Sequence, residues 1–552
     1  MSKFILMNYL KKHSNTIMLL LILVVAFFSR LYFFSQEGFI TTDGVKYALA
    51  GKNLIENGKY EVFGNPELIF SPGYPIFIGI ANCFFDNLLF SARFISFIFG
   101  FLAVYFFYLV GKEIFNKTAG LFAAFFAATH YMFIVLSVET WSESLYSFFV
   151  LLIVFIYLKL FNQYKTWLAV TLGFVIGYTY LIKPEGMIFL AFPLLFFIFK
   201  KKELGIKKAM QGFLIVVFSF IFVIAPYIFF LHHHTGKISL TTKSAPNLVA
   251  GVIFDGKDFG KISRDESVLY EQTFLNYDEE TNSVKLSKEF ENISLKKHIF
   301  DDPTCFLDRY IKGIWSELII LVNLYSIDIF LIPISALFLF SLATRKLFKK
   351  IFILSFFPIG FLLTFPIFHI ESRYILQAMI FIILLASIGC SLRPKSILLT
   401  VKSIKFNTGN FFLVLGLLIA MLVFINFAGI MSYYLYYSFD YPMEHKIVGE
   451  YLKNNPSYNS DKDIIMSRKP FVSFYADSKN GGPIIPYTTV ENVIKFAKSQ
   501  NVSYIIIGKR YLGIRDNYEE LANLGEYSED IELFYEDDSI KPIKIFRLSF
   551  DE

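Results

Sequence analysis

Charged side chains lie between two strongly apolar segments in the stretch FHIESRYILQ, residues 368–377. An ionised group in or beside hydrocarbon is energetically costly, so its presence indicates a function or an interface position. Arg373 carries the planar guanidinium that binds a phosphate through two hydrogen bonds, and Tyr374 and His369 can donate further hydrogen bonds. The alternative is an arginine that extends to the membrane surface beside an interfacial tyrosine.

Three carboxylates could act in acid–base chemistry. Asp43 follows the first apolar segment, at the start of TTDGVKYALAGKNLIENGKY, which predicts an amphipathic helix on the membrane surface with Thr42 as its N-cap. Asp43 is either a first-turn acid favoured by the helix dipole or a general base at the membrane edge. Glu139 and Glu143 lie four residues apart in SVETWSESLY and share a helix face. They are either solvated end residues or an acidic site, and Glu143 lies deeper toward the apolar segment.

Lys183 is a second candidate for phosphate binding. It lies in GYTYLIKPEGMIF, at a turn between two short apolar segments. Its ammonium could neutralise a phosphate or extend to the membrane surface. The nearby pattern FSPGYPIFIGI, residues 70–80, contains two prolines and two glycines in an apolar context. Such irregular backbone is not tolerated against lipid, so this segment should pack against protein or line a cavity.

Metal and disulfide chemistry have weak signals. His232, His233 and His234 are consecutive, and adjacent histidines do not easily converge on one ion. The three cysteines show no metal-ligand spacing and are too few for a disulfide framework. The patterns require no cofactor, and a divalent metal ion is left as an open alternative.

The elements that must position these residues are apolar helices. The chain has 552 residues, is 55% hydrophobic and only 18% charged, and has a mean hydropathy of +0.53, values that exclude an ordinary soluble protein. A spanning helix needs roughly 20 apolar residues. The sequence predicts eleven such segments: about 15–35, 91–111, 118–138, 142–161, 166–182, 185–199, 209–231, 316–344, 351–368, 373–391 and 410–432.

The charge distribution predicts the orientation of these helices. With the N-terminus in the cytoplasm, the inner connections hold 20 Lys and Arg residues against two acidic ones, Glu113 and Glu203. This bias agrees with the positive-inside rule, and it accounts for the basic residues without a nucleic-acid surface. We therefore expect a multi-pass protein of the cell membrane, whose C-terminal part lies outside the cytoplasm. The first segment is too long for a cleaved signal peptide.

Two domains follow from this topology. Residues 1–432 form the transmembrane domain, with large outside loops at 36–90 and 232–315. Residues 433–552 carry 14 basic and 19 acidic residues and form a small extracytoplasmic domain. Strand-like runs at Asp463–Met466, Tyr504–Ile507 and Ile543–Leu548, with a helical stretch at Val490–Ser499, indicate an α/β fold.

Taken in order, these stretches resemble the polytopic inverting glycosyltransferases of the GT-C class, which take sugars from polyprenyl phosphates. They are most similar to bacterial relatives of protein O-mannosyltransferase and lipid A aminoarabinose transferase. The resemblance covers about residues 15–400 and rests on the acid at Asp43 and on the fragments SPGYP, ARFISFIFG, SESL, LIKPE, Pro226–Gly251 and SRYIL. The chain departs from the pattern at Gly44, where the family often has a second acid, and at Lys183, where it has arginine.

The resemblance implies a mechanism and its partners. Arg373, assisted by Lys183, Tyr374 and His369, would bind the phosphate of a polyprenyl-phosphate sugar. Asp43 would take the proton of an acceptor on a protein, a lipid or an envelope glycan, and direct attack would invert the anomeric centre.

Two other classes of function remain as alternatives. A transporter or flippase for lipid-linked sugars also carries charges and broken helices within the membrane, and a non-catalytic scaffold would only bind a partner through its C-terminal domain. The sequence shows no inverted repeat, and the charged residues gather at one membrane face, so an enzyme fits better.

Overall fold

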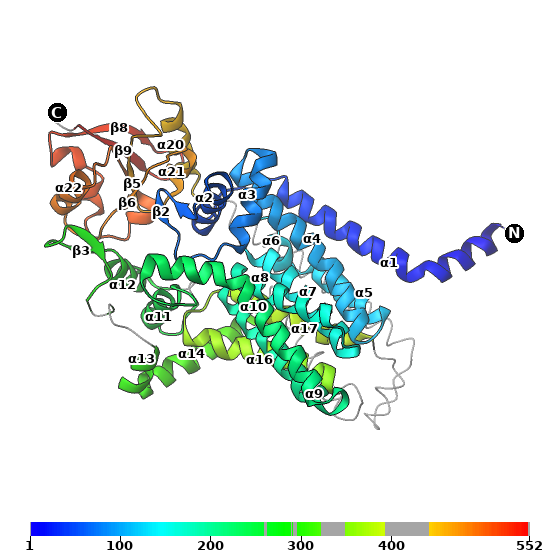
Figure 1. The fold of residues 1–552 in the computed structure, drawn as a ribbon. Helices are drawn as coiled ribbons and strands as arrows, with labels where there is room; N and C mark the ends of the chain where they lie inside the picture. Colours follow the sequence, from blue (N-terminus) through cyan, green and yellow to red (C-terminus); the bar gives the residue numbers. More distant parts are fainter. Residues whose placement is uncertain are drawn as a thin grey trace.

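The computed structural model describes residues 2–258, 262–288, 290, 295–321, 348–391 and 441–549. An elongated helical bundle carries a β-sheet at the end farthest from the N-terminus (Figure 1). The bundle contains α1 (Ser2–Phe34), α4 (Leu88–Ile114), α5 (Lys117–Thr129), α6 (Tyr131–Val135), α7 (Glu143–Asn162), α8 (Thr166–Ile182), η1 (Pro184–Leu190), α9 (Ala191–Leu204), α10 (Ile206–Thr235), α16 (Phe348–Thr364), η3 (Phe365–Ile367), η4 (Ser372–Ile375) and α17 (Leu376–Cys390).

Helix α17 lies at the centre of the bundle. All its residues from Leu376 to Ile388 are buried, as expected for a helix that is apolar on every side. It packs against α16, α5, α4 and α7. The short helix η4, which precedes α17 and contains Arg373, is therefore held by the most buried element of the bundle.

Within the described ranges, five helices are long and apolar enough to cross a membrane: Lys12–Phe34, Leu88–Ile114, Glu143–Asn162, Ile206–Thr235 and Ser372–Cys390. The protein is thus mostly helical and has the features of a multi-pass membrane protein. Helix α14 (Pro303–Leu321) covers the start of the expected segment 316–344. The rest of that segment and all of 410–432 lie outside the described residues, so the count of eleven spans stays a prediction.

The expected segment 118–138 is not one helix. Helix α5 ends at Thr129, and α6 begins after His130, whose side chain accepts a hydrogen bond from the Met132 amide. Buried Arg30 of α1 donates hydrogen bonds to the carbonyls of Ala127 and Ala128 at the end of α5. These carbonyls lack helical partners, so the arginine satisfies the broken end and fixes α1 to it.

The first outside loop folds into α2 (Thr42–Asn57), β1 (Glu61–Val62), β2 (Asn65–Pro66) and α3 (Gly73–Phe85). The expected N-cap at Thr42 is wrong by one residue, because the Thr41 side chain accepts the hydrogen bond from the Gly44 amide. Instead of lying open on a surface, α2 packs against α3, α4 and α21. The expectation that the SPGYP segment packs against protein is confirmed, since Gly73 lies against the backbone of Leu181 in α8.

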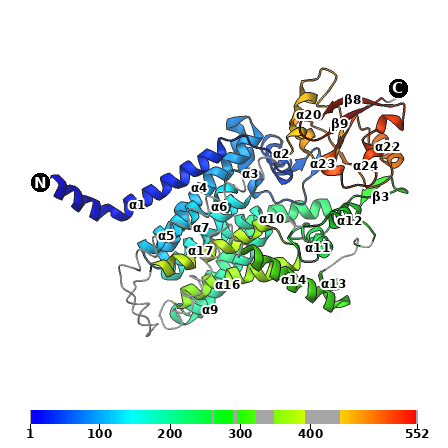
Figure 2. The same cartoon turned by 180° about the vertical axis from the view of Figure 1, so that it is seen from behind.

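The second large loop forms α11 (Ser244–Ile253), α12 (Arg264–Phe274), the hairpin β3 (Asn276–Asp278) and β4 (Ser283–Lys285), and α13 (Leu295–Asp301) before α14. A capping box at Ser263 and Glu266 begins α12. Figure 2, the view from behind, shows α11, α12 and β3 at the same end of the bundle as the C-terminal sheet.

The C-terminal segment forms a five-stranded sheet in the order β6-β5-β7-β9-β8. Its elements are α20 (Met443–Asn454), β5 (Ile465–Ser467), α21 (Phe471–Tyr475), β6 (Gly481–Ile484), α22 (Val490–Ser499), β7 (Tyr504–Gly508), α23 (Lys509–Leu512), α24 (Tyr518–Leu521), η5 (Leu524–Glu526), β8 (Ile531–Asp537) and β9 (Ile543–Leu548). The strands β5, β6 and β7 are parallel, and β9 pairs antiparallel with β7 and β8.

Central strand β7 is buried on both faces. Ile505 and Ile507 pack in one cluster with residues of α22, whereas Tyr504 and Ile506 pack in the other with residues of α20 and α21. This alternation places helices on both sides of the sheet.

Candidate functional site

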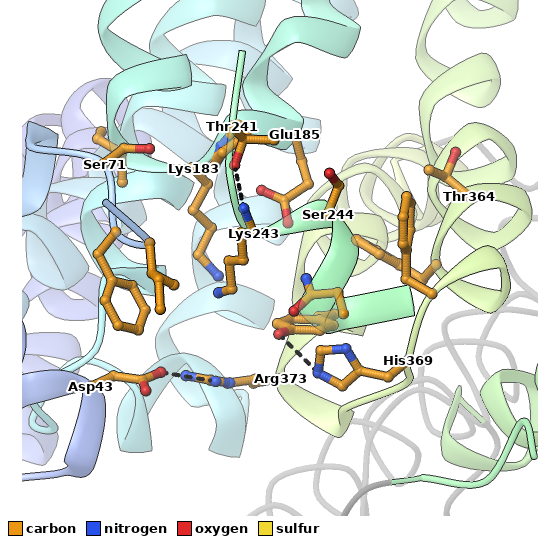
Figure 3. A pocket seen from close by; sticks show the side chains of 18 of the residues that line it. Asp43, Ser71, Lys183, Glu185, Thr241, Lys243, Ser244, Thr364, His369 and Arg373 are labelled. Atoms are coloured by element: carbon orange, nitrogen blue, oxygen red, sulfur yellow. Dashed lines mark hydrogen bonds and ion pairs between the residues drawn. The ribbon is translucent and has the colours of Figure 1, made fainter. Parts of the chain in front are cut away.

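A cavity of about 140 Å³ lies where the first outside loop, η1, the start of α11 and η4 meet (Figure 3). It is a concave pocket with converging polar groups, the usual form of a small-molecule site. Its charged and polar lining residues are Asp43, Ser71, Lys183, Glu185, Thr241, Lys243, Ser244, Asn247, Thr364, His369 and Arg373. Its apolar and aromatic lining residues are Tyr47, Ile69, Phe70, Ile182, Pro184, Phe365, Phe368 and Tyr374.

Arg373 is the centre of the charged network. Its Nη2 lies 3.1 Å from Asp43 Oδ2, its Nη1 lies 3.8 Å from Glu143 Oε1, and its Nε donates to the carboxylate of Glu371. The guanidinium also lies 5.1 Å from the centroid of the Trp141 ring, within range of a cation–π interaction. Residues 330 positions apart in the sequence, Asp43 and Arg373, are thus brought into direct contact (Figure 3).

Asp43 occupies the first turn of α2 and remains 25% exposed at its side chain, so it is open to the cavity. Burial favours the protonated carboxyl, but the charges of Arg373 and Lys243 outweigh burial and lower the pKa of Asp43 below its usual range. The pKa of Glu371 is lowered too: burial opposes its charge, and Arg373 stabilises it more strongly. Both carboxylates are therefore ionised at neutral pH.

Lys183 lies on the opposite wall from Asp43 (Figure 3). Its Nζ is 2.7 Å from Glu143 Oε1 and 5.4 Å from the centroid of the Tyr374 ring. Tyr374 in turn lies with its hydroxyl 3.4 Å from His369 Nε2. The four residues expected to bind a phosphate, Arg373, Lys183, Tyr374 and His369, all line the same cavity.

The expectation that Glu139 and Glu143 share a helix face is wrong, because Glu139 lies in the turn before α7 and Glu143 is the first residue of that helix. Glu143 is buried behind the cavity wall and forms ion pairs with Lys183 and Arg373. Glu139 does not line the cavity, and its Oε1 accepts a hydrogen bond of 2.7 Å from the Tyr441 hydroxyl of the C-terminal segment. Burial raises the pKa of Glu139. Glu139 thus contacts the C-terminal segment, and of these two glutamates it is Glu143 that pairs with cations of the cavity.

Sequence reasoning missed Lys243 and Glu185. Figure 3 shows the ammonium of Lys243 directed into the cavity beside that of Lys183. Lys243 Nζ lies 5.0 Å from the centroid of the Phe70 ring and, among the described residues, within salt-bridge distance of no carboxylate. The sequence offered one signal for Lys243: it lies in the polar run TTKS, residues 241–244, immediately before the helix α11.

The three consecutive histidines, a weak signal for metal binding in the sequence, do not gather around a common point with other ligands in the part of the chain that the structure describes. His232, His233 and His234 are exposed in the last turn of α10, a position where a helix favours basic groups. No cluster of three or more His, Cys, Asp or Glu residues suited to a metal ion occurs within the described ranges.

The chain combines a bundle of apolar helices, a cavity lined by Lys183, Lys243 and Arg373, and a C-terminal β-sheet. Residues 70–230 match the dolichyl-phosphate-mannose-protein mannosyltransferase family. The resemblance inferred from the sequence is thereby confirmed, and the chain has the GT-C fold. No curated protein sequence matches the chain.

Solved structures share the fold of this chain. The archaeal oligosaccharyltransferase AglB from Archaeoglobus fulgidus, in complex with an inhibitory peptide and a dolichol-phosphate, superimposes with a TM-score of 0.59 at 14% identity, over 94% of this chain and 72% of AglB. ArnT from Cupriavidus metallidurans superimposes in the apo state with a TM-score of 0.56 at 12% identity, over 97% of this chain and 98% of ArnT. ArnT bound to undecaprenyl phosphate gives a TM-score of 0.56 at 12% identity, over 96% and 97% of the two chains. At such low sequence identity, these superpositions establish a shared fold alone.

Proposed function

We propose that the protein is an inverting glycosyltransferase, which moves a sugar from a polyprenyl-phosphate donor to an acceptor at the outer face of the cell membrane. The observation that carries this proposal is the contact between Asp43 and Arg373 in a cavity that also receives Lys183 and Lys243. Two carboxylates, Asp43 and Glu185, and three cations line this one cavity. They provide what such a transfer needs: a proton acceptor, for which we propose Asp43, and a binding site for the leaving phosphate.

Arg373, Lys183 and Lys243 differ in how many carboxylates lie beside them. Arg373 faces Asp43, Glu143 and Glu371, and Lys183 faces Glu143, whereas Lys243 is balanced by no carboxylate at salt-bridge distance among the described residues. A donor phosphate entering the cavity would therefore find Lys243 available first. Arg373 could then exchange part of its contact with Asp43 for the phosphate oxygens, and this exchange would free the carboxylate for the acceptor.

The transfer itself balances as a single displacement. The acceptor oxygen or nitrogen attacks the anomeric carbon while the bond from that carbon to the phosphate oxygen breaks. The polyprenyl phosphate leaves with the electron pair, stabilised by Lys243, Arg373 and Lys183, and Asp43 takes the proton of the acceptor. Attack from the side opposite the phosphate inverts the anomeric centre.

The similar structures support a lipid phosphate as the donor anchor, since AglB was solved with a dolichol-phosphate and ArnT with undecaprenyl phosphate. We propose a protein, lipid or envelope-glycan acceptor, with the N-terminus of the chain in the cytoplasm and the sheet on the far side of the membrane. Lys183, Lys243 and Arg373 can each donate hydrogen bonds to a phosphate in this cavity, so we propose that no metal ion is required. Transfer that is lost in EDTA and restored by Mg²⁺ would contradict this last point.

The test compares cells that lack the protein with cells complemented by the wild type, Asp43→Asn or Asp43→Glu at equal expression. Mass spectrometry of glycans and glycolipids should show one sugar mass that disappears on deletion. Wild type should restore it and Asp43→Asn should not, because loss of a general base costs about 10²–10⁴-fold in rate. Full restoration by Asp43→Asn would exclude Asp43 as the base and favour a transporter or a scaffold.

A further inference from the structure

The turn between α6 and α7 packs against the start of α2, which carries Asp43, and against Arg373. Asp43 and Arg373 are the two groups in contact at the centre of the proposed reaction. Apart from Trp141, which is partly buried, the residues of the turn are buried, and Thr140 has no exposed surface. A polar residue buried this completely must have its hydrogen-bonding groups satisfied by specific partners. The partners of Thr140 are on the segment that begins α2.

Thr140 bonds the N-cap of α2 at two points. The Thr41 amide donates to Thr140 Oγ1 at 3.0 Å, and the two threonine hydroxyls lie 3.0 Å apart. The Thr41 hydroxyl in turn accepts the Gly44 amide at 2.9 Å. Asp43 lies in the sequence between Thr41 and Gly44, which this hydrogen bond joins. The position of the Asp43 backbone is therefore set by Thr140 through Thr41.

Gly44 shows how closely the two segments approach. A Cβ atom at position 44 would lie 2.3 Å from Thr140 Oγ1 and 2.8 Å from Thr140 Cβ. Neither distance is sterically allowed, so any larger residue at position 44 would displace the turn or the helix. A second acid after Asp43 would need the space that Thr140 occupies.

The next residue of the same turn contacts the other group. The Trp141 ring lies 5.1 Å from the guanidinium of Arg373, and the Trp141 carbonyl accepts a 3.1 Å hydrogen bond from Ser96 of α4. Consecutive residues thus hold the carboxylate side and the guanidinium side of the ion pair. A shift of the turn would move one group relative to the other.

We propose that Thr140 is a positioning residue, whose hydroxyl fixes the N-terminus of α2 and keeps Asp43 aligned with Arg373 and the bound substrates. This inference rests on the proposed function and deepens it. Thr140 does not line the cavity, so it acts on the reaction only through Thr41 and Asp43. Misplacement of a reacting group by about 1 Å lowers rates by about 100-fold, so the expected effect is on turnover and not on donor affinity.

The experiment measures sugar transfer by the full-length protein in liposomes, from a polyprenyl-phosphate sugar to the acceptor class that the mass spectrometry identifies. Thr140→Val keeps the shape of the side chain and removes the hydroxyl, whereas Thr140→Ser keeps the hydroxyl and removes the methyl group. Thr129→Val is the matched control, because it removes a hydroxyl that bonds only within α5. We expect Thr140→Val to lower kcat by about 10- to 100-fold with donor KM within about twofold of wild type.

The pH profile separates positioning from general damage. In Thr140→Val, loss of alignment should weaken the contact between Asp43 and Arg373 and so raise the pKa of Asp43. The acid limb of its kcat/KM profile should therefore move to higher pH. Thr140→Ser keeps the hydroxyl, so its kcat and its acid limb should match those of the wild type. Unchanged kcat in Thr140→Val, equal losses in the Val and Ser variants, or a rise in donor KM alone would each overturn the inference. Wild-type protein without transfer activity, or an active Asp43→Asn variant, would overturn the proposed function and this inference with it.

Discussion

At the scale of single residues, carboxylates are unevenly distributed among the cations that line the cavity. Three carboxylates, Asp43, Glu143 and Glu371, surround Arg373, and Glu143 also neutralises Lys183. Lys243 contributes the positive charge that this network does not compensate. The distribution suits a site that remains stable when empty and still attracts an anion.

Lys243→Ala should weaken binding of a polyprenyl phosphate to the purified protein. A hydrogen bond to a charged group contributes about 1.5–3 kcal/mol, so the dissociation constant should rise by about 10-fold or more. Lys237→Ala is the matched control, because Lys237 belongs to the same connection and is exposed away from the cavity. Equal affinity in the two variants would contradict a phosphate role for Lys243.

The same substitution should change the pH dependence of transfer. The proposed reaction needs ionised Asp43, so activity should fall as pH decreases through the pKa of Asp43, which the charges of Arg373 and Lys243 hold below its usual range. Removal of the Lys243 charge raises this pKa and moves the acid limb of kcat/KM to higher pH. An unchanged limb in Lys243→Ala would show that another group controls it.

At the scale of elements, α2 approaches α3 without side chains between them. A Cβ atom at Gly51 would lie 2.2 Å from the Pro75 carbonyl oxygen, and a Cβ at Gly79 would lie 2.2 Å from the Gly51 carbonyl oxygen. Glycine is required at both positions because the backbones themselves are in contact. This contact fixes α2, and therefore Asp43, against the bundle.

Gly51→Ala should separate α2 from α3 and destabilise the protein by about 1–3 kcal/mol, the usual range for overpacking. The measurement is the midpoint of thermal unfolding in detergent at a fixed heating rate, together with transfer activity. Gly360→Ala in α16 is the control, because a Cβ there meets only the tip of Ile188 at 3.3 Å. An unfolding midpoint in Gly51→Ala equal to that of the control would contradict the close contact.

At the scale of the whole molecule, the C-terminal sheet is attached to both outside loops. Phe39, four residues before Asp43, packs against Phe471 and Tyr475. On the other side, Glu271 of α12 is buried between Arg468 and Arg515, with 3.0 Å between Arg515 Nε and Glu271 Oε2. Residues of the C-terminal segment therefore hold both of the outside loops that contribute to the cavity.

Glu271→Gln should release the second loop from the sheet. Removal of one partner from a buried ion pair costs about 3–5 kcal/mol, because it leaves uncompensated buried charge. The expected result is a lower unfolding midpoint and faster proteolysis within 232–315. Glu280→Gln, an exposed change in the same loop, should remain within about 0.5 kcal/mol of wild type. Equal proteolysis of the two variants would argue against this attachment.

Much of the element pattern could be predicted from local sequence. The apolar segments correspond to α4, α7, α8 and α10, and the expected helix Val490–Ser499 matches α22 residue for residue. The hydrophobic periodicity of 118–138 could not reveal the helix break at His130. That break depends on Arg30 of α1, which bonds the carbonyls at the end of α5. The N-cap was misplaced by one residue because Thr41 and Thr42 look equivalent until Thr140 is known to bond the first.

The sequence by itself determined the class of protein, the positions of most helices, and the residue types that could act at a membrane-edge phosphate site. Only the tertiary structure decided which of these residues meet. Asp43 and Arg373 are 330 residues apart yet in contact. Glu139 and Glu143 are only four residues apart, yet Glu139 precedes α7, Glu143 begins it, and the two have different partners. Hydropathy and spacing report how each segment is buried, whereas contact between distant side chains depends on how the segments pack together.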